Sequence, residues 1–165
     1  MPYNLSFNKQ NYSSYKKHPN KRTSMATTAN INIYLLLKKG DQLLLSLREN
    51  TGYMDGMHGL VAGHVENNES ASQALVREAM EEAGIKINPD HISTVHIMHR
   101  QTDRNNIDIF MQCKDYEGHI SNIEPHKCKN LTFYSTKNLP DTTIPYIKTA
   151  LQNIQNNIFY SELNW

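Results

Sequence analysis

The sequence predicts a single α/β domain in which two helices pack against a set of strands, and three observations lead to this expectation. First, 165 residues suffice for one well-buried core but are too few for two ordinary domains. Second, apolar residues recur at every second position in several segments and at helical spacing in two others. Third, a content of 38% hydrophobic and 20% charged residues is typical of a globular protein, and no apolar run approaches the roughly 18 residues of a membrane span. Strands mixed with helices favour a layered α/β architecture.

The first third of the chain predicts a β-hairpin, a loop and a short strand. Two apolar runs within 30–47 flank a turn at Gly40, and glycine readily adopts the positive φ that such a turn requires. The glycine-rich stretch 48–59 predicts a loop, and the segment 60–65 predicts a strand that leads out of it.

The remainder predicts a helix, three strands and a second helix. The first helix spans 69–83, starts near Glu69 and Ser70 and ends at Gly84, a residue favoured just after helices. Period-two patterns predict strands at 93–100, 105–114 and 130–135. The last helix covers 142–159 with Pro145 near its first turn, and its apolar stripe comprises Ile147, Ala150, Leu151, Ile154 and Ile158.

The N-terminal segment, residues 1–28, predicts a disordered basic leader ahead of a domain over 29–165. Residues 1–30 contain five Lys or Arg and no acid, which leaves 12 basic and 16 acidic residues for the rest of the chain. A basic tail can bind nucleic acid or a membrane surface. Because this tail lacks an apolar face, we favour a plain leader and expect neither a membrane nor a nucleic-acid partner.

Cysteines and histidines give weaker indications. Cys113 and Cys128 are too few for a disulfide framework and form no CxxC motif, so we expect reduced thiols in a cytoplasmic protein. Eight histidines invite a search for a metal site, but His96 and His99 are expected on opposite faces of a strand. No histidine pair has the spacing of metal ligands. The sequence leaves a homodimer open.

The acidic side of the first predicted helix is a candidate functional site. At about 100° per residue, Glu78, Glu81 and Glu82 fall within an arc of about 100° and are expected to point outward together. Arg77 lies four residues before Glu81 and can brace it as an i,i+4 pair. A separate apolar face is expected to pack on the sheet, and it comprises Leu75, Val76, Ala79, Met80 and Ala83.

Three carboxylates this close raise each other's pKa values unless a cation compensates. Oxygen ligands without His or thiolate favour Mg²⁺ or Mn²⁺ over Zn²⁺. The alternative is a solvated acidic face, which is the usual meaning of a run of charges.

The spacing around this helix resembles the Nudix box position for position. The segment GHVENNESASQALVREAMEEAGI, residues 63–85, matches the box from its first glycine to the closing Gly84 and Ile85. A chance match is on the order of one in ten million at average residue frequencies. Family members often have Pro-Gly before the box glycine, where this chain has Val61 and Ala62. Neither this departure nor Ala79 at the aliphatic position removes a carboxylate, so the resemblance implies an active enzyme rather than an idle binding module.

The resemblance implies an α/β/α sandwich with a mixed sheet and a Mg²⁺-dependent hydrolase, with Mn²⁺ as a substitute, that cleaves a nucleoside diphosphate linked to another group. By the family pattern, Glu78, Glu81 and Glu82 bind the metal together with a backbone carbonyl near Gly63. Glu78 or another carboxylate helps to activate the attacking water. Glu69 and Arg77 orient the other groups. Bound Mg²⁺ neutralises diphosphate oxygens and makes water a better nucleophile at neutral pH.

Residues outside the box predict the substrate side of the site. Some family members have a further metal-binding glutamate before a late strand, and Glu124 occupies a similar place, with an ordinary surface acid as the alternative. Arg48 ends the second strand and either meets phosphate or caps a hairpin. Arg100 and Arg104 lie at a strand end and turn, where binding residues often sit. Tyr146 either stacks on a base or belongs to the core.

The expected substrate class follows from excluding subfamilies whose typical marker residues this chain lacks. ADP-ribose hydrolases typically have a proline about 15 residues after Gly84, and this chain has His99 there. The tyrosine typical of diadenosine polyphosphate hydrolases and the NADH-type SQPWPFPxS sequence are absent as well. We therefore favour a nucleoside triphosphate pyrophosphohydrolase acting on standard or oxidised nucleotides. Hydrolysis of ADP-ribose or nucleotide sugars, or of the 5′ end of RNA, is the alternative.

Overall fold

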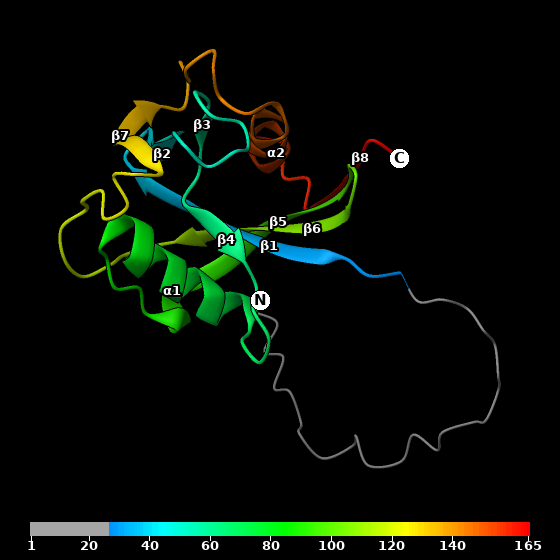
Figure 1. Cartoon of the computed structure of the whole chain (residues 1–165), viewed down its shortest axis with the longest axis horizontal. Helices are drawn as coiled ribbons and strands as arrows, with labels where there is room; N and C mark the ends of the chain where they lie inside the picture. The colour runs from blue at the N-terminus through cyan, green and yellow to red at the C-terminus, as the bar shows by residue number, and fades with distance from the viewer. Residues whose placement is uncertain (1–26) are drawn as a thin grey trace, which may run out of the picture.

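The computed structural model describes residues 27–165, which form eight β-strands, two α-helices and a short 3-10 turn (Figure 1). The predicted leader, residues 1–28, therefore lies almost wholly outside the described residues. Within the described part, no helix is long and apolar enough to cross a membrane.

The predicted hairpin is confirmed in strands β1 (Asn30–Lys39) and β2 (Gln42–Arg48). Gly40 takes a φ of 62° in the turn between them, as the sequence predicts. The two strands pair only next to this turn, at Lys38 with Leu43 and Lys39 with Gln42. Beyond these pairs they diverge, so that β1 and β2 organise different parts of the sheet.

The larger part of the sheet is mixed and is centred on β1. On one side β1 pairs in parallel with β6 (Asn105–Cys113), and on the other it pairs antiparallel with the short β4 (Ala62–His64). Strand β5 (Ile92–Gln101) runs antiparallel to β6, and β8 (Tyr160–Leu163) continues the sheet in parallel with β5. The smaller part is antiparallel and places β2 between β7 (Cys128–Ser135) and β3 (His58–Gly59).

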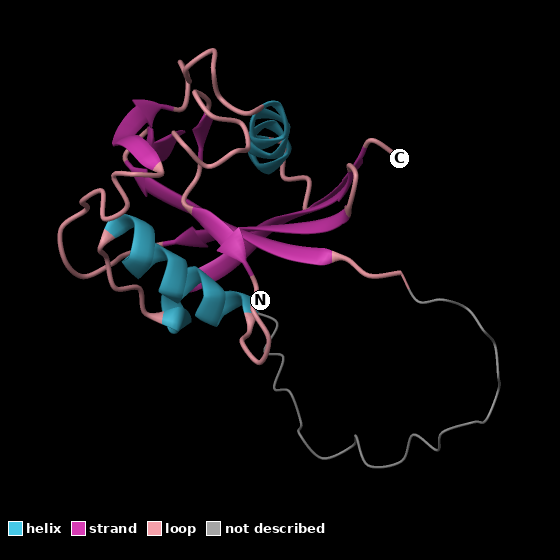
Figure 2. Ribbon diagram, in the orientation of Figure 1, coloured by secondary structure: helices cyan, strands magenta, loops and turns pink. Residues whose placement is uncertain are grey.

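Helices α1 (Ala71–Ala83) and α2 (Pro145–Gln155) cover opposite faces of the sheet (Figures 1 and 2). Alternate side chains of β1 supply both cores, as period two requires. Ile33 and Leu35 pack on the side of α1, whereas Tyr34 and Leu36 pack on the side of α2. The predicted α/β/α sandwich with a mixed sheet is confirmed.

The C-terminal part differs from the prediction. The helix predicted over 142–159 ends at Gln155, because Asn157 takes a positive φ of 57° and the Ile158 N–H bonds back to the Asn153 carbonyl. Ile158 is therefore 42% exposed and does not belong to the apolar stripe, which was wrong at this position. The chain then forms β8, an edge strand whose polar and exposed residues gave no period-two apolar signal.

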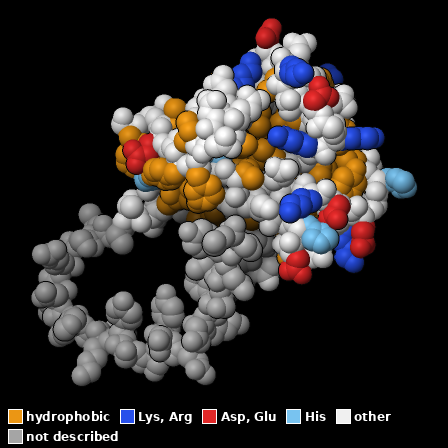
Figure 3. All heavy atoms as spheres, turned by 180° about the vertical axis from the view of Figure 1, so that it is seen from behind, with side chains coloured by type: hydrophobic (Ala, Val, Ile, Leu, Met, Phe, Trp, Pro, Cys, Tyr) orange, Lys and Arg blue, Asp and Glu red, His pale blue; other side chains and the backbone are white. Residues whose placement is uncertain are grey.

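The surface opposite to the view of Figure 1 carries acidic and basic side chains intermixed, beside a patch of hydrophobic atoms (Figure 3). Exposed large apolar residues cluster in sequence near β8, namely Ile158, Phe159, Tyr160 and Trp165.

Candidate metal and nucleotide-binding site

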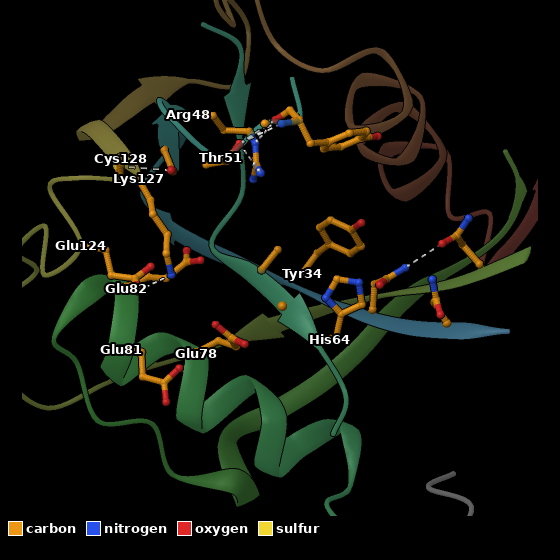
Figure 4. A pocket seen from close by; sticks show the side chains of 18 of the residues that line it. Tyr34, Arg48, Thr51, His64, Glu78, Glu81, Glu82, Glu124, Lys127 and Cys128 are labelled. Atoms are coloured by element: carbon orange, nitrogen blue, oxygen red, sulfur yellow. Dashed lines mark hydrogen bonds and ion pairs between the residues drawn. The ribbon is translucent and has the colours of Figure 1, made fainter. Parts of the chain in front are cut away.

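A cavity of about 960 Å³ lies between α1, β4, the loop before β7 and the N-terminal turn of α2 (Figure 4). Of the residues predicted for the site, Glu69 does not line this cavity. The others do, and they are Arg48, Gly63, Arg77, Glu78, Glu81, Glu82, Arg100, Arg104, Glu124 and Tyr146. Residues far apart in the sequence thus meet in one place, and their chemical roles remain predictions.

Helix α1 begins and ends where its local sequence predicts. The Ser70 side chain accepts a hydrogen bond from the Gln73 N–H while the Gln73 side chain accepts one from the Ser70 N–H, which forms a capping box. Gly84 follows the helix at a φ of 67°, and its N–H reaches the last-turn carbonyls. These caps fix the rotation of α1 and hence the direction of its carboxylates.

The acidic face of α1 turns into the cavity, and the expectation that all three carboxylates point outward is wrong. The Glu81 side chain is 53% exposed, whereas that of Glu78 is 14% exposed and Glu82 is half-buried. Met80, predicted to pack on the sheet, is 47% exposed. The buried stripe of the helix is narrower than predicted and consists of Ala74, Leu75, Ala79 and Ala83.

Gly63 lets the Glu78 side chain lie directly against β4. A Cβ added at Gly63 would stand 1.8 Å from Oε1 of Glu78 and 2.2 Å from its Cδ, distances at which atoms overlap. With any other residue at this position, Glu78 must move away. The first glycine of the box is therefore a steric requirement of the adjacent carboxylate.

Arg77 joins three carboxylates and a backbone carbonyl. Its guanidinium donates to Glu69 at 2.8 Å, to Glu78 at 2.7 Å and to Glu81 at 3.2 Å. A further bond of 3.1 Å reaches the carbonyl of His64 in β4. The predicted i,i+4 contact with Glu81 is present, and Arg77 connects α1 to β4 and to the loop that carries Glu69.

Glu82 and Glu124 form the second half of the acidic cluster. Burial, together with the nearby Glu78 and Glu124 carboxylates, raises the pKa of Glu82 to about 8. Burial also raises the pKa of Glu78. Glu124 is 24% exposed and receives a 2.7 Å bond from the ammonium of Lys127.

This donor set fits a hard divalent cation. Burial, with a smaller effect of neighbouring carboxylates, raises the pKa values of Glu78 and Glu82, so a bound cation would favour their charged forms. Carboxylate oxygens are also the ligands that Mg²⁺ prefers. Among residues 27–165, no three acidic, His or Cys side chains converge into a ready-made ion cage. Instead, Glu78 and Glu81 pair with Arg77, and Glu124 pairs with Lys127.

The other end of the cavity carries a buried polar network on the α2 side of the sheet. Asp108 is fully buried and accepts hydrogen bonds from Arg100 Nε at 2.6 Å and from Asn32 Nδ2 at 2.7 Å. The Arg100 guanidinium also lies 4.0 Å from the centre of the Tyr146 ring. The phenols of Tyr34 and Tyr146 are 3.3 Å apart, and burial raises the pKa of Tyr146 to about 12, so both hydroxyls stay protonated.

Arg100 reaches the cavity as predicted, but its charge is matched by Asp108. It is therefore suited to a polar, aromatic subsite rather than to a phosphate. Arg48 remains half-exposed at the rim, where it donates to the carbonyl of Tyr53 and to Thr51. Arg104 is 66% exposed and lies 3.6 Å from Asp103.

Sequence reasoning missed Asn32 and Lys127, which line the cavity, and Asp108, which is fully buried and binds Arg100. Asn32 and Asp108 each lie between two isoleucines, at the polar positions of an alternating strand, so the pattern indicated solvent exposure rather than a buried network. Nothing in the sequence distinguished Lys127 from other surface lysines.

Comparisons with known proteins agree with this geometry. The family model described as NUDIX domain matches residues 26–152. The NAD-capped RNA hydrolase NudC of Shigella dysenteriae is 30% identical over 113 residues, which cover 68% of this chain and 42% of that protein. The same hydrolase of Shigella flexneri is 42% identical over 55 residues, 33% of this chain and 21% of that protein. The chain thus spans less than half the length of these curated relatives.

Among solved structures, a MutT NUDIX hydrolase from Burkholderia pseudomallei is similar with a TM-score of 0.69 at 19% identity, covering 76% of this chain and 97% of that one. The MutT protein of Methanosarcina mazei has a TM-score of 0.68 at 17% identity and covers 81% of this chain and 97% of that one. At such low identity these structures show a common fold.

Proposed function

Because the chain belongs to the NUDIX domain family, we propose that it is a Mg²⁺-dependent pyrophosphohydrolase of nucleoside triphosphates, standard or oxidised, that releases a nucleoside monophosphate and pyrophosphate. The observation that carries the proposal is the layout of the cavity. Carboxylates for a cation lie at one end, and a buried polar and aromatic subsite lies at the other. A nucleotide has the same division into a charged phosphate end and a flat, polar base.

Different side chains of the cavity would bind the metal, orient the carboxylates and accept a proton. Glu78, Glu82 and Glu124 would hold the metal, which when bound supplies positive charge to the diphosphate oxygens. Arg77 would orient Glu78 and Glu81 through its hydrogen bonds of 2.7 Å and 3.2 Å to them. Glu78 or a neighbouring carboxylate would take the proton of the attacking water.

Substrate positioning falls to the residues around the cavity. Arg48 and Arg104 at the rim present cationic side chains to phosphates. Tyr34 and Tyr146 supply aromatic surface beside Arg100, where a base can stack and form hydrogen bonds.

A second candidate function comes from the relatives. NudC proteins are described as NAD-capped RNA hydrolases, so cleavage of a diphosphate at the 5′ end of RNA is the alternative to a free nucleotide. Either reaction breaks a diphosphate linkage and needs the same carboxylates.

One experiment decides between the two. Purified protein is incubated with Mg²⁺ and a panel of standard and oxidised nucleoside triphosphates, ADP-ribose and NAD-capped RNA, and the products are separated by chromatography. The proposal expects monophosphate and pyrophosphate from a triphosphate, with the highest kcat/KM in the panel. A higher kcat/KM for NAD-capped RNA or ADP-ribose would transfer the assignment to that substrate. Glu82→Gln serves as the inactive control.

A further inference from the structure

Lys127 enters the acidic cluster from the loop before β7. Its ammonium lies 2.7 Å from Oε1 of Glu124, and its side chain remains 51% exposed (Figure 4). Lys127 lines the same cavity as Glu78 and Glu82. Lys127 is therefore a cation placed where a metal ion is predicted to bind.

The loop that carries Glu124 and Lys127 is fixed at both sides of the cavity. The Ile123 N–H donates to the carbonyl of Glu82 at 3.1 Å, which ties the loop to the C-terminal turn of α1. The Glu49 N–H donates to the carbonyl of Lys127 at 2.8 Å, which ties it to the end of β2. The backbone under Lys127 is held while its long side chain can still change partner.

The other cations of the cavity are bound in different ways. Among the described residues, Arg77 is shared by three carboxylates, and Arg100 is paired with the buried Asp108. Arg48 and Arg104 lie at the rim. Arg77 keeps Glu69 as a partner even when Glu78 and Glu81 bind a metal. Lys127 differs because its one carboxylate partner among the described residues is Glu124, a predicted metal ligand, so occupation of the site by a divalent cation removes that partner.

We propose that Lys127 exchanges partners: it neutralises Glu124 in the metal-free protein, and once Glu124 and Glu82 hold a divalent cation its ammonium binds the phosphate oxygens of the nucleotide or of pyrophosphate. The exchange follows from charge, because an ammonium is repelled by a divalent cation on the same carboxylate and attracted by the anion beside it. A lysine suits this role since its charge is compact and its stem flexible. The inference rests on the function proposed for the cavity.

The first test measures metal binding without any nucleotide. In metal-free protein, Lys127→Met should bind Mn²⁺ about tenfold more tightly than the wild type, because a competing charge contact worth about 1.4 kcal/mol is gone. The electron paramagnetic resonance signal of free Mn²⁺ reports this affinity. Lys129→Met is the matched control, since Lys129 is a nearby lysine that pairs with Glu49 at 3.8 Å and does not line the cavity.

The second test measures the binding of inorganic pyrophosphate in the presence of Mg²⁺ by calorimetry. Lys127→Met should weaken this binding about tenfold, whereas Lys127→Arg and Lys129→Met should stay near the wild type. Mn²⁺ affinity of Lys127→Met equal to that of Lys129→Met would overturn the proposal, and so would unchanged pyrophosphate affinity.

Neither readout depends on turnover, so the proposal and the proposed function fail separately. If both tests give the expected changes but no nucleotide is hydrolysed, the partner exchange stands and the substrate assignment falls. If nucleotides are hydrolysed and the Lys127→Met and Lys129→Met proteins behave alike, the exchange falls. Thermal unfolding of each variant checks that it is folded.

Discussion

Glu82 should make the stability of the metal-free protein depend strongly on pH. Its pKa of about 8 lies above the reference value of 4.5 for an exposed glutamate, so between these values the folded state holds a proton that the unfolded state has released. The free energy of unfolding is therefore highest at the acidic end of this window, and it falls as the pH rises from the unfolded pKa to the folded pKa. The difference of about 3.5 pH units corresponds to a penalty of at most about 5 kcal/mol above pH 8.

The perturbation that isolates this effect is Glu82→Gln, which removes the charge and keeps the shape. Urea unfolding in EDTA at pH 8 and at pH 5.5 gives the free energy of unfolding of each protein. At pH 8 the variant should be more stable than the wild type by about 3 to 5 kcal/mol, and at pH 5.5 most of that difference should vanish. Adding Mg²⁺ at pH 8 should stabilise the wild type but not the variant.

Another titrating group also affects the comparison. Burial lowers the pKa of His58, so its contribution to the stability of both proteins is lost as the pH falls, and only the difference in stability between wild type and variant reports on Glu82. A matched variant serves as the control. Glu81→Gln removes a carboxylate from the same helix at an exposed position, and it should change stability little at either pH. Equal stability of the wild type and Glu82→Gln at pH 8 would refute the reasoning.

Three further predictions follow from the contacts of the cavity. Hydrolysis should stop in EDTA and return with Mg²⁺ or Mn²⁺; recovery by Zn²⁺ alone would contradict the oxygen-ligand site. Gly63→Ala should lower kcat by about 10²-fold or more while the protein stays folded, because the new methyl group displaces the Glu78 side chain. Steady-state kinetics measure this loss, and a kcat equal to that of the wild type would contradict the steric role of Gly63. Asp108→Asn should reduce the free energy of unfolding by about 3 to 5 kcal/mol, since it leaves the Arg100 charge buried without its partner. Urea denaturation measures this loss, and adding Arg100→Met to the same protein should recover part of it.

Local features of the site could be predicted from the sequence because they are set by residues near one another in the chain. The spacing of Glu78, Glu81 and Glu82 on one helix, with Gly84 to end it, required only helical geometry. The depth at which these carboxylates lie could not be predicted, because it depends on how closely β4 approaches α1 at Gly63. Glu78 and Glu82 therefore proved half-buried where the helical pattern alone indicated an exposed face.

The polar end of the cavity depends on strand pairing, which the pattern of single strands does not reveal. The parallel register of β1 and β6 places Asn32 opposite Asp108. The antiparallel register of β5 and β6 then brings Arg100 beside Asn106, one alternate position away from Asp108. Asn32 and Asp108 stand at the polar positions of alternating strands, where the pattern predicts solvent exposure, and only the assembled sheet makes them a buried network. The edge strand β8 was missed for a related reason, since its pairing with β5 rather than its composition makes it a strand.

The two cations within the acidic cluster differ in kind, and this difference determines how the site can respond to a metal ion. Arg77 is held by a planar fork of donors that contacts Glu69, Glu78 and Glu81 at once, an arrangement that a single competing ion on one carboxylate does not dissolve. Lys127 has one carboxylate contact and is about half exposed. Arg77 thus holds α1 against β4 through several contacts, whereas Lys127 can leave Glu124 by breaking one. If every carboxylate of the cluster were held as Glu78 is, none would be free to bind a divalent cation. If none were held, the carboxylates would not be fixed in position before the metal binds.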